Sequence, residues 1–351
     1  MEALKGSTVV APIRTAVVGF GISGKVFHAP LIAADASYSL DVIVTADPDR
    51  SAEAARLYPN TRIVPTPEDL FALSGDLDLV VLGTPPLTHF DLAATAIAHG
   101  LHVVVDKPFV ATSDQGHELI SRAADAGVQL TVFQNRRWDA DFLTLQKLIG
   151  EGALGKVRSF ESRFEWWRPE GFGNWRDTAA VSEGGGILND LGAHLIDQAI
   201  QLFGPVTESY GETANHGPDP GGADTEAFVS LLHESGVRSR LWMNGMAPQV
   251  GPRFHVLGSE SGYTKWGLDG QEPALAAGMT PSDPAYGIEP QIHWGALGTD
   301  GDLRPTAPEP GAYPLFYAQL ASALRGEGPL PVNPQESLDV LNAIENVRAF
   351  A

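Results

Sequence analysis

Hydrophobic positions follow two different patterns along the chain, and the change from one to the other falls near residue 134. In the first part, short and almost wholly apolar runs are separated by stretches with a helical period. Such runs predict strands that are covered on both faces. The predicted strands are residues 15–19, 40–45, 62–64, 77–83, 102–105 and 128–133, and the predicted helices are 25–34, 49–58, 67–73, 88–99 and 113–126. Strands that alternate with helices indicate a parallel sheet with helices on both faces.

Beyond residue 135 the pattern changes to the alternation of strands with one solvated or partner-covered face. These predicted strands are residues 157–165, 206–213, 226–232, 237–246 and 253–257, and the predicted helices are 140–149, 189–203, 314–325 and 334–350. Residues 267–314 are rich in Gly and Pro, and we expect them to form an excursion or arm. The second part therefore predicts an α+β domain with a mostly antiparallel sheet.

Composition narrows the classes of partner and chemistry. The chain has 351 residues with 23 basic and 43 acidic side chains, a net charge of −20, and no cysteine. Two domains fit this length, at about 100–200 residues each. The acidic balance argues against nucleic acid and membrane surfaces as partners, and the missing cysteine excludes disulfides and thiolate chemistry. Residues 1–12 lack the apolar core of a signal peptide and no apolar run could cross a bilayer, so we expect a cytoplasmic protein.

A glycine-rich segment, Gly-Phe-Gly-Ile-Ser-Gly at residues 19–24, follows the first predicted strand and opens the first predicted helix. In such a segment the first glycine allows a tight turn, the second lets a pyrophosphate approach the backbone, and the third lets helix and strand pack closely. A plain turn is the alternative, but the neighbouring elements lie where a dinucleotide fingerprint needs them. We therefore interpret residues 1–134 as a Rossmann dinucleotide-binding domain and residues 135–351 as a second, α+β domain whose last helices could pack back on the first.

The end of the second strand should select the cofactor. Asp47 lies 23 residues past Gly24, close to the position from which an acidic residue binds the ribose diol of NAD. Thr45 and Ala46 precede it, so no arginine for a 2′-phosphate follows the strand at once, although Arg50 is close. Asp47 could equally cap the next helix. The pattern favours NAD over NADP.

Lys107 lies in the Asp-Lys-Pro segment that ends the fifth predicted strand. Ligands of open parallel sheets bind beyond the carboxyl ends of the strands, where a lysine could stabilise a developing alkoxide. A lysine held in a salt bridge at the strand end is the alternative, and position alone does not decide between the two.

Asp190, His194 and Asp197 follow a Gly-Gly-Gly run at residues 184–186. Asp190 and His194 are four positions apart, so a helix would place them on one face. A carboxylate one turn from an imidazole can orient it for acid/base work. Asp190 could instead cap the helix, His194 could be a hydrogen-bonded core residue, and the set could hold a metal ion.

Arginine and tryptophan side chains are concentrated around the predicted junction. We interpret Arg136 and Trp138 as anchors of the domain interface. Arg168, Trp175 and Arg176 could serve the same purpose or could bind a polyhydroxylated ligand through forked donors and flat apolar faces.

Taken together, these motifs resemble the Gfo/Idh/MocA oxidoreductases (glucose–fructose oxidoreductase, inositol dehydrogenase and rhizopine catabolism) over nearly the whole chain. The resemblance is carried by residues 19–30, 83–89, 106–108 and 184–197, and its Asp-Lys-Pro replaces the usual Glu-Lys-Pro. Within the family the sequence is most similar to bacterial scyllo-inositol dehydrogenases, through residues 135–144, 168–169, 175–176, 251–253 and 265–272.

The resemblance implies an NAD(P)-dependent enzyme that moves hydride between a cyclitol or sugar and nicotinamide. It also implies a C-terminal domain that binds substrate and forms a homodimer or homotetramer through its open sheet. The expected catalytic residues are Lys107, Asp190 and His194, with no metal. The expected cofactor contacts are Gly19, Gly21, Ile22, Ser23, Gly24, Thr45, Asp47, Thr84, Pro85, His89, Lys107 and Asn135, and the expected substrate contacts are Lys107, Arg168, Trp175, Asp190 and His194.

In the mechanism that this implies, His194 removes the hydroxyl proton, Asp190 orients the imidazole, and Lys107 steadies the charge on the reacting oxygen. Three other functions use the same residues differently. An NAD-dependent glycosidase would oxidise its substrate only transiently, a dinucleotide-sensing regulator would have lost catalysis, and a metal-dependent enzyme would lose activity on chelation.

Overall fold

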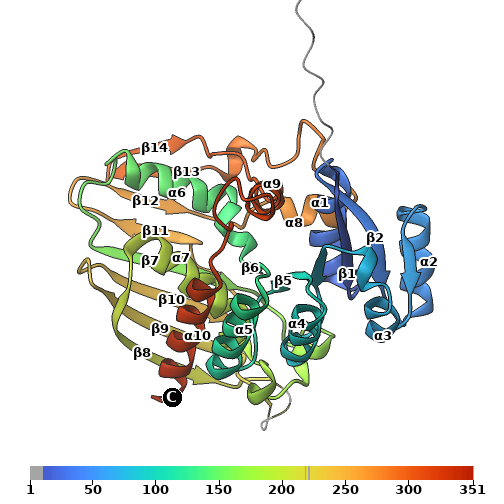
Figure 1. Cartoon of the computed structure of the whole chain (residues 1–351). Coiled ribbons are helices and arrows are strands. Elements are labelled where there is room, and N and C mark those ends of the chain that lie inside the picture. The colour runs from blue at the N-terminus through green and yellow to red at the C-terminus, as the bar shows by residue number, and fades with distance from the viewer. Residues whose placement is uncertain (1–10, 218, 220–221, 351) are drawn as a thin grey trace, which may run out of the picture.

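The structure is a computed structural model that describes residues 11–217, 219 and 222–350. Most of residues 1–12, on which the expectation of no signal peptide rests, lies outside the described part. Two sheets lie side by side, the first at the right of Figure 1 and the second at the left. Among the described residues, no helix combines the length and the apolar character that crossing a bilayer requires.

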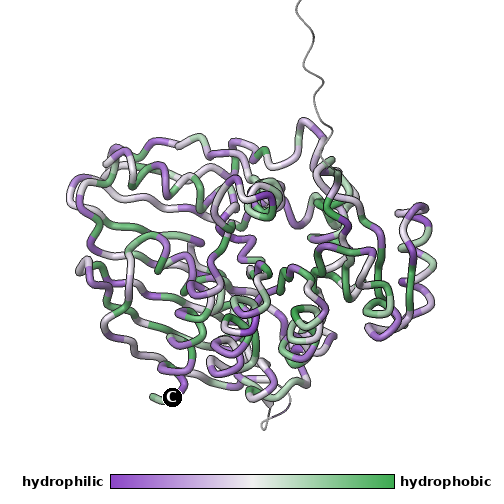
Figure 2. Tube along the Cα trace, viewed as in Figure 1, coloured by the Kyte–Doolittle hydropathy of each residue, from purple (hydrophilic) through white to green (hydrophobic). Residues whose placement is uncertain are grey.

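The first sheet is parallel and has the strand order β3-β2-β1-β4-β5-β6. Its strands are β1 (Ile13–Val18), β2 (Tyr38–Val44), β3 (Arg62–Val64), β4 (Leu79–Leu82), β5 (His102–Asp106) and β6 (Leu130–Phe133). Figure 2 shows these strands as largely hydrophobic, as burial on both faces requires. The order reverses between β1 and β4, which opens a crevice for ligands beyond the carboxyl ends of these strands.

Helices connect these strands, as the sequence predicts. They are a π-helical turn (Ser23–His28) that continues into α1 (Ala29–Ala34), α2 (Pro48–Leu57), α3 (Pro67–Phe71), α4 (His89–Ala98) and α5 (Ser113–Ala126), with short 3₁₀ turns at Ser74–Asp76, Pro86–Thr88 and Asn135–Trp138. Local chemistry explains the ends of α5, because Thr112 accepts a hydrogen bond from the Gln115 backbone amide and Gly127 adopts φ +68°.

The second sheet has the order β14-β13-β12-β11-β7-β10-β9-β8, in which β7 and β10 pair in parallel and the other described neighbours pair antiparallel. Its strands are β7 (Ser159–Glu165), β8 (Val206–Ala214), β9 (Glu226–His233), β10 (Arg238–Asn244), β11 (Phe254–Leu257), β12 (Gly262–Lys265), β13 (Gly295–Thr299) and β14 (Asp302–Thr306). The helices of this part are α6 (Ala140–Gly150), a π-helical turn (Leu188–Gly192) that continues into α7 (Ala193–Phe203), α8 (Gln271–Ala276), α9 (Pro314–Leu324) and α10 (Pro334–Arg348), with 3₁₀ turns at Trp175–Asp177, Val181–Glu183 and Gln291–His293. The α/β class with a large, mostly antiparallel second sheet is confirmed.

The Gly- and Pro-rich segment at residues 267–314 contains regular secondary structure and is not the irregular arm that the sequence predicts. It contributes α8 and the strands β13 and β14, which extend the second sheet beyond β12. The strands β13 and β14 form because β13 pairs with β12, a segment some thirty residues earlier, and a Gly-rich sequence carries no local signal for such pairing.

The end of the chain returns to the first sheet. Phe316, Tyr317 and Leu320 of α9 are buried in the same core as β1 to β6, whereas Val340 and Ile344 of α10 belong to the core of the second sheet. Figure 1 shows α9 and α10 between the two sheets. The closing helices therefore fix the positions of the two sheets relative to each other.

Candidate active site

A cleft of about 1210 Å³ lies where the first sheet faces the second. One part is lined by the glycine-rich segment and by the ends of β2, β4 and β5, and the other by β7, by residues 166–176 and by the start of the helix at Leu188. The expected site residues that line it are Gly19, Gly21, Ile22, Ser23, Thr45, Asp47, Thr84, Pro85, Lys107, Asn135, Arg168, Trp175, Asp190 and His194. The structure thus gathers nearly all of them in one space.

The glycine-rich segment has the geometry of a dinucleotide fingerprint. Gly19 has φ +92°, and a Cβ there would lie 2.8 Å from the carbonyl oxygen of Gly83. A Cβ at Gly24 would lie 1.9 Å from the carbonyl oxygen of Gly19, so only glycine permits this contact between turn and helix. Gly21 is open, with no atom nearer to its Cβ position than an Arg50 guanidinium nitrogen at 3.7 Å. The open backbone of Gly21 therefore fits the approach of a pyrophosphate, and NAD(P) fits this part of the cleft.

The end of β2 gives Asp47 the capping position that the sequence left open. Its Oδ1 accepts hydrogen bonds of 3.0 Å from the backbone amides of Asp49 and Arg50. Its Oδ2 lies 3.8 Å from Nε of Arg50. Asp47 still lines the cleft with Thr45 and Arg50, so capping does not remove it from the cofactor side.

Two expected cofactor contacts do not line the cleft. The third glycine, Gly24, is packed against Gly19 as described above. His89 is fully buried, with Nε2 at 2.8 Å from the Thr84 carbonyl oxygen and Nδ1 at 3.1 Å from those of Pro108 and Phe109. Burial lowers the pKa of His89. In this structure His89 joins two cofactor-side loops and is not itself at the surface of the cleft.

The end of β5 and the helix after the glycine run meet at Lys107 and Asp190. The Lys107 ammonium donates hydrogen bonds of 2.7 Å to Oδ1 of Asp190 and of 3.0 Å to its backbone carbonyl. Both side chains are largely buried, with exposed fractions of 13% and 9%. The residues are 83 positions apart, so only the tertiary fold brings them together.

Arg176 is a second cation on the same carboxylate. Its Nε donates a hydrogen bond of 2.7 Å to Oδ2 of Asp190, and a terminal nitrogen lies 3.3 Å from Oδ1. Burial alone would raise the pKa of Asp190, but the charges of Lys107 and Arg176 outweigh it and hold that pKa below its ordinary value. The carboxylate is therefore ionised at neutral pH. The sequence left Arg176 undecided, and its signals were its place beside Trp175 and the similarity of residues 175–176 to bacterial scyllo-inositol dehydrogenases.

His194 is buried in the wall of the cleft as a neutral imidazole. Burial, with the nearby charges of Lys107 and Arg136, lowers its pKa well below the ordinary value. Its Nδ1 has no hydrogen-bond partner among the described residues, and its ring meets Phe164 edge-on with centroids 6.0 Å apart. A neutral ring in contact with the cleft can accept a proton.

The expected orientation of His194 by Asp190 is not found. No hydrogen bond joins the two side chains in the described part of the chain, because the carboxylate is directed at Lys107 and Arg176. Asp190 lies in the π-helical turn and His194 in α7. Both residues nevertheless line the same cleft, so the missing contact follows from the two cations on Asp190 and not from a difference in helical face.

The third carboxylate, Asp197, is a structural ion pair. Nε of Arg137 donates a 2.8 Å hydrogen bond to Asp197, and another nitrogen of Arg137 donates a 2.7 Å bond to Glu336 on α10. Nowhere in residues 11–217, 219 and 222–350 do three or more His, Asp or Glu side chains gather in a way that could hold a metal ion.

Arg136 and Trp138 join segments that are far apart along the chain, and Arg136 also lines the cleft. Its guanidinium bonds Glu272 at 2.6 Å and the Tyr313 hydroxyl at 3.1 Å, and the Trp138 ring meets Phe316 edge-on. Segments far apart along the chain are joined here, which stabilises one wall of the cleft.

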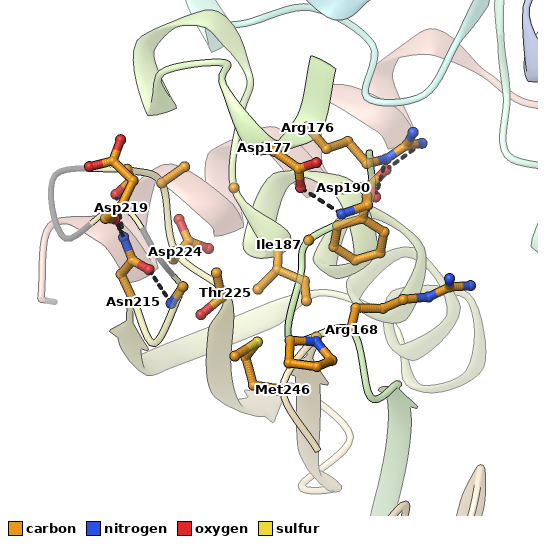
Figure 3. Close-up of a pocket in the computed structure, with 18 of the residues that line it drawn as sticks. Arg168, Arg176, Asp177, Ile187, Asp190, Asn215, Asp219, Asp224, Thr225 and Met246 are labelled. Carbon is orange, nitrogen blue, oxygen red and sulfur yellow. Dashed lines mark hydrogen bonds and ion pairs between the residues drawn. The ribbon is translucent and has the colours of Figure 1, made fainter. Parts of the chain in front are cut away.

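A smaller cavity of about 100 Å³ adjoins the cleft and is drawn in Figure 3. The two spaces share Arg168, Phe172, Arg176 and Asp190. Met246 and Ile187 give the smaller cavity an apolar wall, and Arg168 borders both spaces without being buried. Of the residues that form these walls, the sequence missed those whose position depends on the path of the loop at 168–178, such as Phe172 and Asn174.

Comparisons with known proteins agree with this geometry. The oxidoreductase-family model with an NAD-binding Rossmann fold matches residues 13–134, and the model of the GFO/IDH/MocA C-terminal domain matches residues 142–264. The scyllo-inositol 2-dehydrogenase (NADP(+)) IolW of Bacillus subtilis is 34% identical over 97% of this chain and 94% of its own. The uncharacterized oxidoreductase YdgJ of Escherichia coli is 39% identical over 95% and 94%.

Solved structures give the same result. The oxidoreductase yvaA from Bacillus subtilis superposes with a TM-score of 0.90 at 31% identity, over 98% of this chain and 97% of its own. The YPO2259 oxidoreductase from Yersinia pestis reaches a TM-score of 0.88 at 37% identity, over 97% and 95%. The similarity therefore covers both sheets and the cleft between them.

Proposed function

The chain belongs to the GFO/IDH/MocA family of NAD(P)-binding oxidoreductases, and from that membership we propose that it interconverts a secondary alcohol and a ketone on a cyclitol or sugar. Scyllo-inositol is the first candidate substrate, because the relative from Bacillus subtilis is named for it and is similar over nearly the whole length of both chains. The observation that carries the proposal is the contact of Lys107 with Asp190 beside His194, in the same cleft that the glycine-rich segment lines.

NAD or NADP, when bound, supplies the hydride acceptor for the carbon that is oxidised. The remaining work belongs to the side chains of the cleft. Lys107, whose side chain is largely buried, donates a hydrogen bond to the reacting oxygen and stabilises the negative charge that develops on it. His194 takes the hydroxyl proton, which its neutral ring is able to accept. Asp190 holds the ammonium group of Lys107 in place.

Ring hydroxyl groups of the substrate would contact Arg168 and Trp175, which line the cleft near the three catalytic residues. A guanidinium offers several donors in a fixed plane, and an indole offers an apolar face. This pair suits a polyol better than a compact apolar alcohol.

For the coenzyme we propose NAD as the preferred form. Asp47 borders the cleft past the end of β2, and Ala46 stands where an arginine would favour a 2′-phosphate. The Bacillus subtilis relative carries NADP(+) in its name. If this chain also binds NADP, Arg50, a cation that lines the cleft beside Asp47, would contact the extra phosphate.

We propose a homodimer or homotetramer that forms through the second sheet. On the sheet face opposite its core, Phe228 and Trp242 lie half-buried with ring centroids 5.2 Å apart, and the Arg163 guanidinium lies 3.9 Å from the Trp242 ring. Light scattering of the purified protein tests this, with Trp242→Asp as the disrupting variant. A monomer at micromolar concentration would contradict it.

The decisive experiment is a spectrophotometric screen of inositols and sugars with NAD and NADP. We expect reduced coenzyme to form with at least one polyol, and His194→Ala to lower kcat by about 10²–10⁴. Wild-type turnover by His194→Ala would refute its assigned role. Release of the leaving group from an aryl glycoside without net coenzyme reduction would replace the proposal with a glycosidase.

A further inference from the structure

We propose that Arg176 is a positioning residue of this active site: it holds the Asp190 carboxylate on Lys107 and away from His194, and so leaves the imidazole free to take the substrate proton. The inference rests on the proposed function for its kinetic consequence only. The arrangement of charges that it describes is testable in the protein without any substrate.

The contacts of Asp190 divide its two oxygens between two cations. Oδ1 accepts from Lys107 at 2.7 Å, and Oδ2 accepts from Nε of Arg176 at 2.7 Å. Figure 3 shows Arg176 reaching Asp190 from the neighbouring loop, with the interaction drawn as dashed lines. A carboxylate with an ionised donor on each oxygen is fixed in rotation, since turning it toward His194 would break at least one charged hydrogen bond.

Hydrogen bonds within the loop at residues 172–177 hold Arg176 in position. The Asp177 carboxylate accepts hydrogen bonds from the backbone amides of Phe172 (2.7 Å), Gly173 (2.6 Å) and Asn174 (3.2 Å). The Asn174 side chain in turn accepts a 3.1 Å hydrogen bond from the backbone amide of Arg176. These bonds fix the loop next to the guanidinium, so the contact with Asp190 does not depend on a free side chain finding its partner.

The surrounding charges show why this contact matters for His194. The ring faces Lys107, Arg136 and Arg253, whose charges lower its pKa, and Asp190, whose charge raises it. Without Arg176, Oδ2 of Asp190 would lose its charged partner, and the carboxylate would be free to turn toward His194, whose pKa its charge already raises. The ring would then be protonated over a wider pH range, so a smaller fraction of it would be free to accept the substrate proton.

Arg176→Gln and Arg176→Lys test this, with Arg122→Gln, which removes an exposed helical ion pair far from the cleft, as the matched control. We expect the acidic limb of kcat/KM for alcohol oxidation to move up by about one pH unit in Arg176→Gln. The loss would approach tenfold at pH values below the acidic limb of the wild type and would vanish above that limb. In Arg176→Lys, which keeps a cation at this position, the acidic limb should move up by less than in Arg176→Gln. Arg122→Gln should have the pH profile of the wild type. Circular dichroism checks that each variant is folded.

Nuclear magnetic resonance separates this inference from the proposed function. We expect the His194 ring protons, assigned from a His194→Gln spectrum, to titrate at higher pH in Arg176→Gln than in the wild type, with no substrate present. An unchanged titration, or an equal loss of kcat/KM at every pH, would overturn the positioning role. Turnover of no polyol together with the expected titration shift would support the inference while refuting the proposed substrate class.

Discussion

The glycine-rich segment offers a paired test of cofactor binding against folding, because two of its glycines differ in what a methyl group would meet. A Cβ at Gly24 would lie 1.9 Å from the Gly19 carbonyl oxygen, a distance that no rotation relieves. We expect Gly24→Ala to lower the free energy of unfolding by about 1–3 kcal/mol, the usual cost of overpacking. The expected fall in the midpoint of thermal unfolding is several degrees.

Gly21→Ala should give the opposite result. Its Cβ meets only an Arg50 guanidinium nitrogen at 3.7 Å, and its φ does not lie in the left-handed region. We therefore expect unchanged stability or a gain of up to about 1 kcal/mol from the stiffer unfolded chain. The added methyl group would occupy the approach of the pyrophosphate, so the affinity for NADH should fall at least tenfold, or about 1.4 kcal/mol.

Thermal unfolding and a fluorescence titration with NADH and NADPH measure both variants side by side. Wild-type affinity in Gly21→Ala would refute the reasoning that the dinucleotide crosses this backbone. Wild-type stability in Gly24→Ala would show that the close contact of turn and helix is not needed for the fold.

Three further predictions concern charge. Arg50→Ala should weaken NADP by about fivefold, since an exposed charge pair contributes at most ~1 kcal/mol, while NAD is unaffected; an equal loss for both coenzymes in a binding titration would contradict this. Arg137→Met leaves Asp197, which is 2% exposed, without its cation, and should lower the free energy of unfolding in urea by about 3–5 kcal/mol. Asp197→Asn added to Arg137→Met should recover part of that loss, and no recovery would argue against an unpaired charge as its cause. Because burial holds the pKa of His194 well below its ordinary value, the unfolded chain binds a proton below about pH 6.5 that the folded protein does not, so stability should fall as the pH drops. His194→Gln should reduce that slope relative to His117→Gln, an exposed control, and equal slopes in the two variants would contradict the low pKa.

The helices and strands that carry a local signal could be predicted from the sequence. The strands that form only by pairing with segments far away along the chain could not. The helix at residues 113–126 matches α5, because Thr112 and Gly127 terminate it with chemistry that is visible in the sequence. The strands β13 and β14 were missed because Gly295, Gly298 and Pro305 carry no apolar alternation, and their pairing depends on β12 as a template. The domain boundary near residue 134 stays a prediction, since α9 shares its core with the first sheet.

The candidate site follows the same division. The sequence identified Lys107, Asp190 and His194 by motif and resemblance, and the structure places all three in one cleft. The sequence did not identify the two cations that bind Asp190. Arg176 reaches that carboxylate only because Asp177 folds the loop back on itself, and a tertiary turn of this kind leaves no periodic signal.

Two cations on one carboxylate explain why the three proposed catalytic side chains take separate roles. Asp190 and His194 are four positions apart at the junction of the π-helical turn and α7, and both line the cleft. Lys107, from the end of β5, and Arg176, from the loop, donate charged hydrogen bonds to the two oxygens of Asp190. Burial keeps His194 neutral in the wall of the cleft. In the proposed mechanism Asp190 then fixes the lysine and His194 accepts the proton, a division of roles that the spacing of these residues in the sequence does not reveal.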